Sequence, residues 1–461
     1  MKTLRPYQTR MYAAAINAIV NNVERTSYYA ATGAGKTVVF QQVIDYVLKE
    51  KMLPGKAKKI LVVHPRIALS IDQQDRFRED FRIPYTSFHS GKVVQSTTRD
   101  DEANVFNKST TSVEQLTTML DERAHTDQIV FTTYESLRKI AGLDWDLIIC
   151  DEAHYLATAQ FAPILDEIKS QVMFFTATPI KLAALEHDFS MDNVEKFGEV
   201  VATVSPNELI KLGYMVRPDL FKTVIKTDQN GDVENFSESI ARTFNSQREM
   251  LSDKIPHKML VALPNTQSFD DIMNDLEFIR DMCGDNLEVF YIKASTNKRN
   301  GSIIADRDVA LKQFAETQSP AIMIHCDTLA EGIDIDGLTG AYISRELAQA
   351  KFIQTIGRCV RPYSSDFKAD RTPKKFENRI KQTALINIAI IDNDSRVNAK
   401  VVDWYKALLE AGYPEILGGD PKATLRGAGE APEPDALIFS GILDVNFERA
   451  VEEIENELGE W

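Results

Sequence analysis

One short stretch of this sequence restricts the fold more than any other. Residues 30–37 read Ala-Ala-Thr-Gly-Ala-Gly-Lys-Thr, after a strand-like run at 26–29 and before an apolar, helix-like run at 38–44. A strand, a glycine-rich loop and a helix in this order are typical of a phosphate-binding loop. Gly33 and Gly35 would let the backbone N–H groups converge on one anion, and the helix would add the positive end of its dipole. The stretch therefore predicts an α/β domain that binds a nucleotide.

The side chains of the loop predict a division of roles. Lys36 is expected to reach the β- and γ-phosphates of ATP, and the Thr37 hydroxyl is expected to bind Mg²⁺. Ala30 departs from the usual pattern, because a glycine often opens such a loop, and an ordinary glycine-rich turn before a helix is the alternative. The other positions expected to surround the phosphates are Thr32, Gly33, Ala34 and Gly35.

Composition excludes several classes of protein. The 461 residues correspond to about three domains, and the 44% hydrophobic and 26% charged fractions are those of a globular protein. No apolar run approaches the ~20 residues of a membrane span, and the first residues contain no secretion signal. The four cysteines are scattered, which suggests neither a disulfide framework nor a zinc site and fits a reducing cytoplasm.

The net charge of −15 does not exclude a polyanionic partner, because its distribution is uneven. From Glu430 onward, many carboxylates are opposed only by Arg449. Basic residues cluster elsewhere, at 56–59, 293–299 and 368–381. Such clusters are usually solvated faces, so they permit a nucleic-acid partner without predicting one.

Several apolar runs that end in polar residues predict a first sheet. They alternate with helical segments, which favours a parallel α/β arrangement extending to about residue 200. An amphipathic helix is expected from Met11 to Val20, preceded by an Arg5–Pro6–x–Gln8 element that could offer an amide to an adenine edge. The alternative is that this element is only the beginning of a proline-started helix. Residues 91–127 look like an inserted loop and surface helix without assignable chemistry. The expected strands are 59–64, 128–131, 146–150 and 172–175.

Two acidic residues follow one of these strands. Asp151 and Glu152 come directly after 146–150, and ligands bind at the carboxyl edge of open α/β sheets. Asp151 is expected to hold Mg²⁺, and Glu152 is expected to orient and deprotonate the attacking water. An acidic turn after a strand is the alternative. The hydroxyls of Thr176 and Thr178 follow the next strand and could sense these carboxylates.

A second α/β pattern begins after a short helix and linker at 204–218. Its expected strands are 258–263, 287–292, 321–325, 341–343 and 385–391, without a second phosphate loop. A helix is expected to carry Gln354, Arg358 and Arg361, with the two arginines three residues apart on one face. Guanidinium groups from a second domain can stabilise charge on a γ-phosphate, whereas a basic helix facing solvent is the alternative.

These motifs resemble, in order and spacing, those of superfamily 2 helicases with a DEAH-type box, from Leu4 to Pro362. The segments 207–218 and 329–334 look most like the branch of type III restriction helicase subunits and phage recombination helicases. The resemblance implies two tandem RecA-like domains with parallel sheets flanked by helices, plus a small helical C-terminal extension. The implied bounds are 1–203 for the ATP-binding domain, 204–218 for a linker, 219–395 for the C-terminal helicase domain and 396–461 for the extension.

The resemblance also implies roles for individual residues. Arg5 and Gln8 would contact adenine, and Lys36, Thr37, Asp151 and Glu152 would perform hydrolysis. Gln354, Arg358 and Arg361 would meet the γ-phosphate, while Gly332 and Asp334 would lie near the nucleotide. Pro65, Arg66, Thr133 and Thr328 would contact the nucleic-acid strand. His154, Thr176 and Thr178 would couple the two sites.

The implied function is an ATP- and Mg²⁺-dependent helicase or translocase, with DNA preferred over RNA. An RNA helicase with the same motor, or a motor or assembly subunit of a larger complex, remains open. No nuclease motif is apparent. The acidic tail is expected to be a helix that docks on the motor or is solvated. The alternative is a protein-docking or autoinhibitory tail whose carboxylates compete with nucleic acid. No membrane is expected, and the cytoplasm of a bacterium or phage-infected cell is the expected location.

Overall fold

The computed structural model divides the chain into two compact units, Met1–Ser205 and Pro206–Trp461, each of which is described by itself. Gly332, Asp334, Thr328 and almost all of the expected extension at 396–461, including the acidic tail, lie outside the described residues. No helix among the described residues is both long and apolar enough to cross a bilayer. The described residues are 3–49, 57–67, 70–71, 73–74, 77, 85–90, 108–179, 188–225, 236–251, 255–263, 266–293, 296–325, 335, 337–344, 347, 349–391, 404, 407–408 and 411–413.

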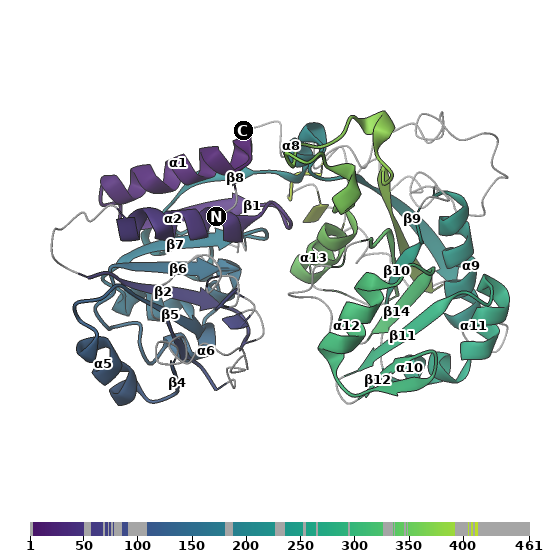
Figure 1. Ribbon diagram of the computed structural model, residues 1–461, viewed down its shortest axis with the longest axis horizontal. Coiled ribbons are helices and arrows are strands. Elements are labelled where there is room, and N and C mark those ends of the chain that lie inside the picture. Colours follow the sequence, from purple (N-terminus) through teal and green to yellow (C-terminus); the bar gives the residue numbers. More distant parts are fainter. Residues whose placement is uncertain are drawn as a thin grey trace. The chain divides into compact units, whose positions relative to one another are not determined.

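Unit 1 is built on an eight-stranded sheet in the order β4-β3-β5-β2-β6-β7-β1-β8 (Figure 1). All of its strand pairs are parallel, so the carboxyl ends of the strands lie along one edge. The five expected strands, including the one at 26–29 that precedes the phosphate loop, are confirmed, whereas β3, β4 and β8 were not expected. The strands are β1 (Arg25–Ala30), β2 (Lys59–His64), β3 (Tyr85–Phe88), β4 (Lys108–Thr110), β5 (Gln128–Thr133), β6 (Leu147–Asp151), β7 (Gln171–Thr176) and β8 (Glu199–Val204).

The central strands are apolar because both faces of the sheet are covered. Every residue of β6 is buried, and so are the last five residues of β2. One core cluster joins these strands to α5 (Val113–Glu122), α6 (Tyr134–Leu137) and the 3₁₀ helices η1 (Ala153–Leu156) and η2 (Ala162–Glu167). The helix α2 (Lys36–Lys49) buries its own apolar stripe and packs against α1 (Pro6–Val20). A short helix, α7 (Val194–Phe197), precedes β8.

The first helix begins earlier than expected. α1 spans Pro6–Val20, so Tyr7 and Gln8 lie in its first turn rather than before it. Proline suits the first helical position because its missing N–H would have no helical partner there. The Gln8 side chain then accepts a hydrogen bond from the backbone N–H of Arg5, which closes the turn. The expected start at Met11 is therefore wrong by a little more than one turn.

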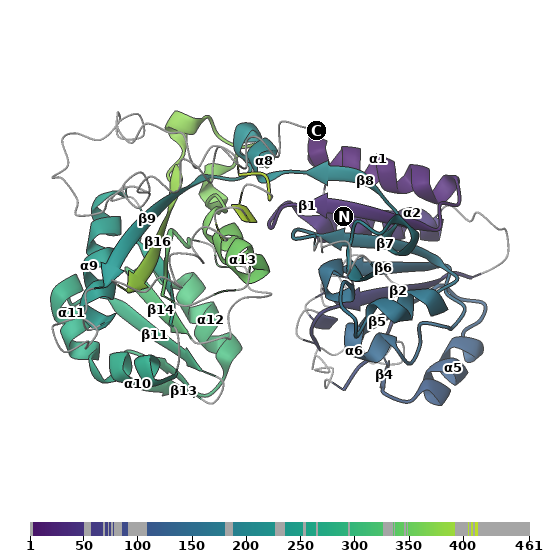
Figure 2. The ribbon, with the colours of Figure 1, turned by 180° about the vertical axis from the view of Figure 1, so that it is seen from behind.

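Unit 2 contains a second eight-stranded sheet, in the order β13-β12-β11-β14-β10-β15-β16-β9 (Figure 2). The expected parallel arrangement is confirmed except at one edge, where β12 and β13 run antiparallel to their neighbours. The two residues between β12 and β13, Asn300 and Gly301, both have positive φ, as a tight hairpin turn requires. The strands are β9 (Arg217–Ile225), β10 (Lys258–Ala262), β11 (Glu288–Lys293), β12 (Thr296–Arg299), β13 (Ser302–Ile304), β14 (Ala321–His325), β15 (Gly340–Ile343) and β16 (Thr383–Ile391).

Helices cover both faces of this sheet. In Figures 1 and 2, α9 (Phe236–Glu249), α10 (Thr266–Asn274) and α11 (Leu276–Cys283) lie on one face, where one core cluster joins them. α12 (Arg307–Glu316) and α13 (Gln349–Cys359) lie on the other face. Within the segment expected as a linker, α8 (Pro206–Leu212) follows the end of β8, and β9 already begins at Arg217.

Candidate functional site

The phosphate loop has the backbone conformation that its sequence predicts. β1 ends at Ala30 and α2 begins at Lys36, so the loop leads directly into the helix N-terminus. Gly33 and Gly35 have φ of 84° and 80°, a region that residues with a side chain rarely adopt. A Cβ atom at Gly35 would also lie 2.4 Å from Gln8 Nε2. The φ therefore favours glycine at position 35, and a Cβ there would in addition displace the Gln8 amide.

Gln8 links the first helix to the phosphate loop. Its Nε2 donates to the Ala34 carbonyl at 2.8 Å, and its Oε1 accepts from the Arg5 backbone N–H at 2.9 Å. A glutamine amide has two N–H donors and two lone pairs, so one of each remains for an adenine edge. The Arg5 guanidinium donates to the Tyr7 hydroxyl at 3.0 Å. Gln8 thus lies beside the loop and braces it, and Arg5 is bonded to Gln8 through its backbone N–H.

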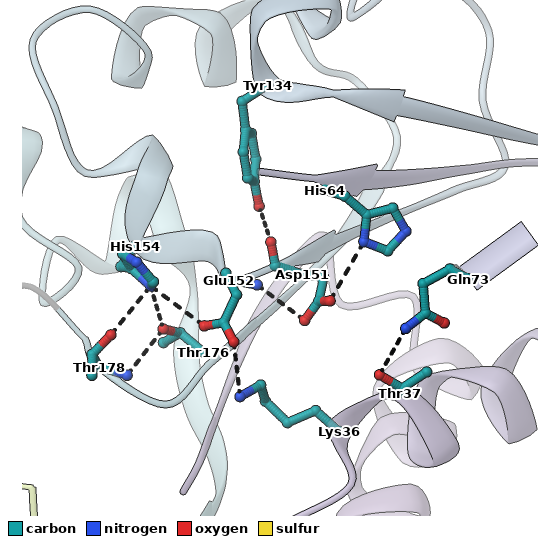
Figure 3. Close-up of polar contacts among 10 residues, drawn as sticks. All are labelled: Lys36, Thr37, His64, Gln73, Tyr134, Asp151, Glu152, His154, Thr176 and Thr178. Atoms are coloured by element: carbon teal, nitrogen blue, oxygen red, sulfur yellow. Dashed lines mark hydrogen bonds and ion pairs between the residues drawn. The ribbon is translucent and has the colours of Figure 1, made fainter. Parts of the chain in front are cut away.

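Glu152 lies just beyond the end of β6, with its carboxylate between two nitrogen atoms. Lys36 Nζ is 3.3 Å from Oε1, and His154 Nδ1 is 3.6 Å from Oε2 (Figure 3). The backbone of Glu152 is in the left-handed region, with φ and ψ of 51°, which is uncommon for a residue other than glycine. The fold therefore brings together the lysine of the loop and the acid that the sequence places 116 positions further on.

The neighbouring Asp151 is buried and held by residues from β2, from α6 and from the turn after β6. Its carboxylate accepts a hydrogen bond from the Glu152 N–H at 3.1 Å and lies 3.4 Å from His64 Nδ1, while its carbonyl accepts from the Tyr134 hydroxyl at 2.6 Å (Figure 3). Burial alone would raise the pKa of Asp151, but contact with His64 and the charge of Lys36 outweigh it and lower the pKa. Asp151 is therefore anionic at neutral pH, as a metal ligand must be.

Thr37 has a partner that the sequence did not reveal. Gln73 Nε2 lies 3.2 Å from Thr37 Oγ1, and the Gln73 side chain is buried (Figure 3). The amide therefore donates to one lone pair of the hydroxyl oxygen and leaves the other available. His64 and Tyr134 were likewise missed, because a histidine at a strand end or a tyrosine after a strand carries no specific signal by itself.

The residues expected to couple the two sites form one hydrogen-bonded group. His154 Nδ1 lies 3.0 Å from Thr176 Oγ1 and 3.3 Å from Thr178 Oγ1, and the Thr178 N–H donates to Thr176 Oγ1 at 3.1 Å (Figure 3). All three side chains are buried. Because His154 also approaches Glu152, the end of β7 is connected to the carboxylates at the end of β6.

Three of the residues expected to contact nucleic acid come from adjacent strands. Pro65 and Arg66 follow β2, and Thr133 ends β5 directly opposite His64 in the parallel register. Arg66 is exposed, whereas only 7% of Thr133 is exposed and its hydroxyl donates to Ser136 Oγ at 3.4 Å. The structure thus brings these positions to one sheet edge, with the Thr133 side chain facing inward.

In unit 2, α13 carries only part of the expected set. Gln354 and Arg358 lie on the helix and are buried, but the helix ends at Cys359, so Arg361 follows it. The expectation that one helix carries both arginines is therefore wrong. Pro362 explains the early end, since a residue before proline is disfavoured in the helical conformation.

Unit 1 contains a parallel sheet with a phosphate loop after one strand and paired acids after another. Unit 2 contains a second, mainly parallel sheet without a phosphate loop. Together these features define a tandem RecA-like ATPase fold. Residues 1–181 match the family model of the type III restriction enzyme res subunit, ResIII. The similarity of the chain to this family model, to curated ATP-dependent helicases and to a solved restriction enzyme confirms the resemblance to superfamily 2 helicases that the motifs indicate.

Two curated relatives are yeast proteins. "Putative mitochondrial ATP-dependent helicase irc3" of Schizosaccharomyces pombe is 23% identical over 344 residues, which cover 73% of this chain and 51% of the relative. "Putative ATP-dependent helicase IRC3" of Saccharomyces cerevisiae is 21% identical over 383 residues, which cover 78% of this chain and 50% of the relative. The chain thus spans about half the length of these relatives.

Among solved structures, the chain is similar to the "ATP-dependent Type ISP restriction-modification enzyme LlaBIII bound to DNA". The TM-score is 0.64 at 17% identity, over 89% of this chain and 30% of that one. At 17% identity, the similarity shows that this chain and part of LlaBIII share a fold.

Proposed function

We propose that this chain is an ATP-dependent nucleic-acid helicase or translocase of the DEAH-box type, acting on DNA in preference to RNA. The observation that carries the proposal is the convergence of Lys36, Asp151 and Glu152 at the carboxyl edge of one parallel sheet. Ligands of open α/β sheets bind at this edge. The curated relatives named as ATP-dependent helicases support the same activity.

Hydrolysis is assigned to the side chains at this edge. Lys36 binds the β- and γ-phosphates, and Glu152 orients the attacking water and accepts its proton. The hydroxyl of Thr37 and the anionic carboxylate of Asp151 are oxygen ligands of the kind that Mg²⁺ prefers. Bound there, Mg²⁺ would neutralise part of the phosphate charge. Gln73 and His64 would keep the two oxygen ligands oriented.

The second unit is proposed to contribute charge to the same reaction. Gln354, Arg358 and Arg361 would contact the γ-phosphate, with Gly332 and Asp334 near the nucleotide. The motif order supports this assignment, and a planar guanidinium suits a phosphoryl group with several equatorial oxygens. ATP bound by both units would favour one arrangement of the units, and hydrolysis would remove that preference.

Movement along a strand requires that the hydrolysis site and the strand contacts be coupled. His154, Thr176 and Thr178 are proposed to couple them, because their hydrogen bonds connect the Glu152 carboxylate to the end of the next strand. Arg66, Pro65, Thr133 and Thr328 are proposed to contact the strand backbone. Such contacts give binding that depends on salt and little on sequence.

DNA is proposed as the preferred strand because LlaBIII, which shares the fold, was solved bound to DNA. The test is the ATPase rate of the purified chain alone, with single-stranded DNA, with branched DNA and with RNA. We expect stimulation by DNA that Glu152→Gln and Lys36→Ala abolish. Stimulation by RNA alone would contradict the DNA preference, and a folded chain without ATPase activity under any condition would contradict the motor.

A further inference from the structure

The segment 363–382, which connects α13 to β16, differs in charge from the rest of the chain. We call it the basic segment. Between residues 367 and 379 it carries five cationic side chains and two carboxylates, a net charge of +3 in a chain whose net charge is −15. None of the functions assigned above uses these charges. Because the chain as a whole repels polyanions, a local excess of positive charge has its largest effect on a phosphate-rich partner.

The tip of the basic segment is an ordered turn. Phe367 and Pro373 form an antiparallel bridge, and the N–H groups of Lys368 and Arg371 bond to the carbonyls of Thr372 and Lys368, each at 2.9 Å. The Asp370 carboxylate accepts from the Thr372 N–H at 2.9 Å and from its hydroxyl at 2.6 Å. One of the two carboxylates is therefore engaged inside the turn.

The base of the basic segment is held by a buried carboxylate. Asp366 accepts hydrogen bonds from the N–H groups of Ile380 at 2.6 Å, Lys381 at 3.1 Å and Tyr363 at 3.3 Å. Only 1% of Asp366 is exposed, so these bonds are shielded from water. They hold the two ends of the basic segment together.

A buried lysine joins that base to α13. Lys381 Nζ donates to the carbonyls of Leu338 at 2.5 Å and Arg361 at 2.6 Å, and also to that of Cys359. An ammonium has three donors, and the last carbonyls of a helix have no partner within the helix. Lys381 therefore caps α13 and fixes the basic segment to it.

A second contact holds the basic segment against the chain that follows α8. Arg379 Nε donates to the Lys374 carbonyl at 2.8 Å, and its Nη2 lies where a Cβ of Gly213 would be 2.0 Å away. The rings of Phe367 and Tyr214 stack with centroids 6.1 Å apart. These anchors make the basic segment a preorganised surface rather than a loose charged loop.

On this surface three lysines converge. Lys368, Lys374 and Lys375 line one cavity of about 630 Å³ together with the amide of Asn378. Within the described part of the chain, Lys374 and Lys375 form no ion pair, whereas the charge of Lys368 acts on the carboxylate of Asp370. Next to them Phe376 is 58% exposed, an unusual position for a phenyl ring. Ammonium groups beside an exposed aromatic ring suit a phosphate backbone whose bases are free to stack.

We propose that the surface formed by Lys368, Lys374, Lys375, Asn378 and Phe376 binds single-stranded nucleic acid, with the lysines on the sugar-phosphate backbone and the phenyl ring against a base. This inference deepens the proposed helicase function and rests on it. It adds a strand contact in unit 2 that none of the recognised motifs contains.

The test compares two triple variants of the full chain that lose the same charge. One is Lys368→Gln/Lys374→Gln/Lys375→Gln, and the control is Lys139→Gln/Lys169→Gln/Lys312→Gln, which removes exposed lysines elsewhere. Binding of a labelled oligo-dT, the same length of oligo-U and a DNA duplex is measured by fluorescence anisotropy from low to physiological salt. We expect about a 10-fold or greater loss of single-strand affinity for the first variant, and a slope of log K against log salt smaller by about 2, because three phosphate contacts are lost.

Further measurements show whether the loss of affinity is specific to this surface. The ATPase rate without nucleic acid and the thermal unfolding midpoint should match wild type in both variants, while the nucleic-acid concentration for half-maximal stimulation rises only in the first. Phe376→Ala should weaken single-strand binding several-fold and duplex binding little. If the first triple variant does not fold, Lys375→Glu alone must show the loss.

Equal affinity and equal salt slope for the two triple variants, with a wild-type ATPase still stimulated by DNA, would overturn the binding surface and leave the helicase proposal standing. Absence of nucleic-acid binding and of stimulated ATPase in wild type would overturn both.

Discussion

Lys36 Nζ lies 3.3 Å from Glu152 Oε1, which joins the phosphate loop directly to the acid that follows β6. Both side chains are largely buried, and His154 approaches the other oxygen of the same carboxylate. The ammonium that is to bind phosphate and the carboxylate that is to activate water are therefore neighbours in one parallel sheet. Substitution of Lys36 should therefore affect the binding of phosphate, whereas substitution of Glu152 should affect the activation of water.

Glu152→Gln should separate ATP binding from hydrolysis. The amide keeps the size of the side chain but cannot accept a proton, so we expect kcat to fall about 10²- to 10⁴-fold. Binding of a fluorescent ATP analogue should change by no more than a few-fold. A variant that hydrolyses ATP at the wild-type rate would show that Glu152 is not the general base.

Gly35→Ala should abolish nucleotide binding. The new Cβ would meet Gln8 Nε2 at 2.4 Å, and the φ of 80° is unfavourable for alanine. The double variant Gly35→Ala/Gln8→Ala removes the clash but keeps the backbone strain and also loses the amide that braces the loop, so we expect no recovery of affinity. Gly142→Ala is the control, because its Cβ would meet nothing within 4 Å, and it should bind ATP normally. Normal binding by Gly35→Ala would contradict the loop geometry.

Gln73→Leu should weaken the response to Mg²⁺. Its amide holds the Thr37 hydroxyl, and loss of such outer-shell bonds typically costs 10- to 100-fold in metal affinity. We expect the Mg²⁺ concentration for half-maximal ATPase to rise about 10-fold, while ATP binding without Mg²⁺ stays unchanged. Gln171→Leu, whose amide bonds to the distant Val23 carbonyl, should leave the titration as in wild type. The same midpoint for all three proteins would contradict the role of Gln73.

Arg358→Lys and Arg361→Lys should lower kcat without a matching loss of ATP binding. Lysine keeps the charge but loses the planar fork that contacts two phosphate oxygens, and an arginine of this kind contributes about 10³-fold or more. Arg280→Lys, on α11, is the control. If kcat falls equally in the control, or in none of the three variants, the proposed contribution of unit 2 is wrong.

His257 should make unit 2 less stable in mild acid. Burial, assisted by the charge of Arg248, lowers the pKa of His257 from 6.5 to about 3, so the folded state holds it neutral. Between about pH 6.5 and pH 3 the unfolded chain binds more protons, so stability is complete above pH 6.5 and is lost as the pH falls. At pH 5 the loss from this group is about 2 kcal/mol.

Urea unfolding at pH 7 and pH 5, followed by a probe in unit 2, measures this loss. His257→Gln should lower stability at pH 7, because the contact with Thr339 Oγ1 at 2.7 Å changes, but should remove about 2 kcal/mol of the difference between the two pH values. An unchanged pH dependence in the variant would show that His257 does not titrate in this way.

Local sequence determined much of the fold. The glycine-rich loop, the paired acids after an apolar run and the buried strands are each contained in fewer than ten consecutive residues, so composition and spacing predict them. The Asn300–Gly301 pair is an equally local signal for the β12–β13 hairpin. Apolar runs do not predict these two strands, because β12 is polar and β13 is short. The spacing of Arg358 and Arg361 predicts one helix, but Pro362 is a local signal for the end of a helix, and α13 ends at Cys359.

Only the tertiary structure decided which residues support the site. Tyr134 reaches the Asp151 carbonyl across 17 positions, Gln73 reaches Thr37 across 36, and Lys381 caps α13 from 22 positions beyond Cys359. A hydrogen bond over such distances depends on strand order, register and crossover, and none of these is recorded in the spacing of a motif. The sequence thus determined the reacting groups and the local turns that present them, whereas packing decided what holds those groups in place and where the basic segment lies, because those contacts exist only after the sheets have formed.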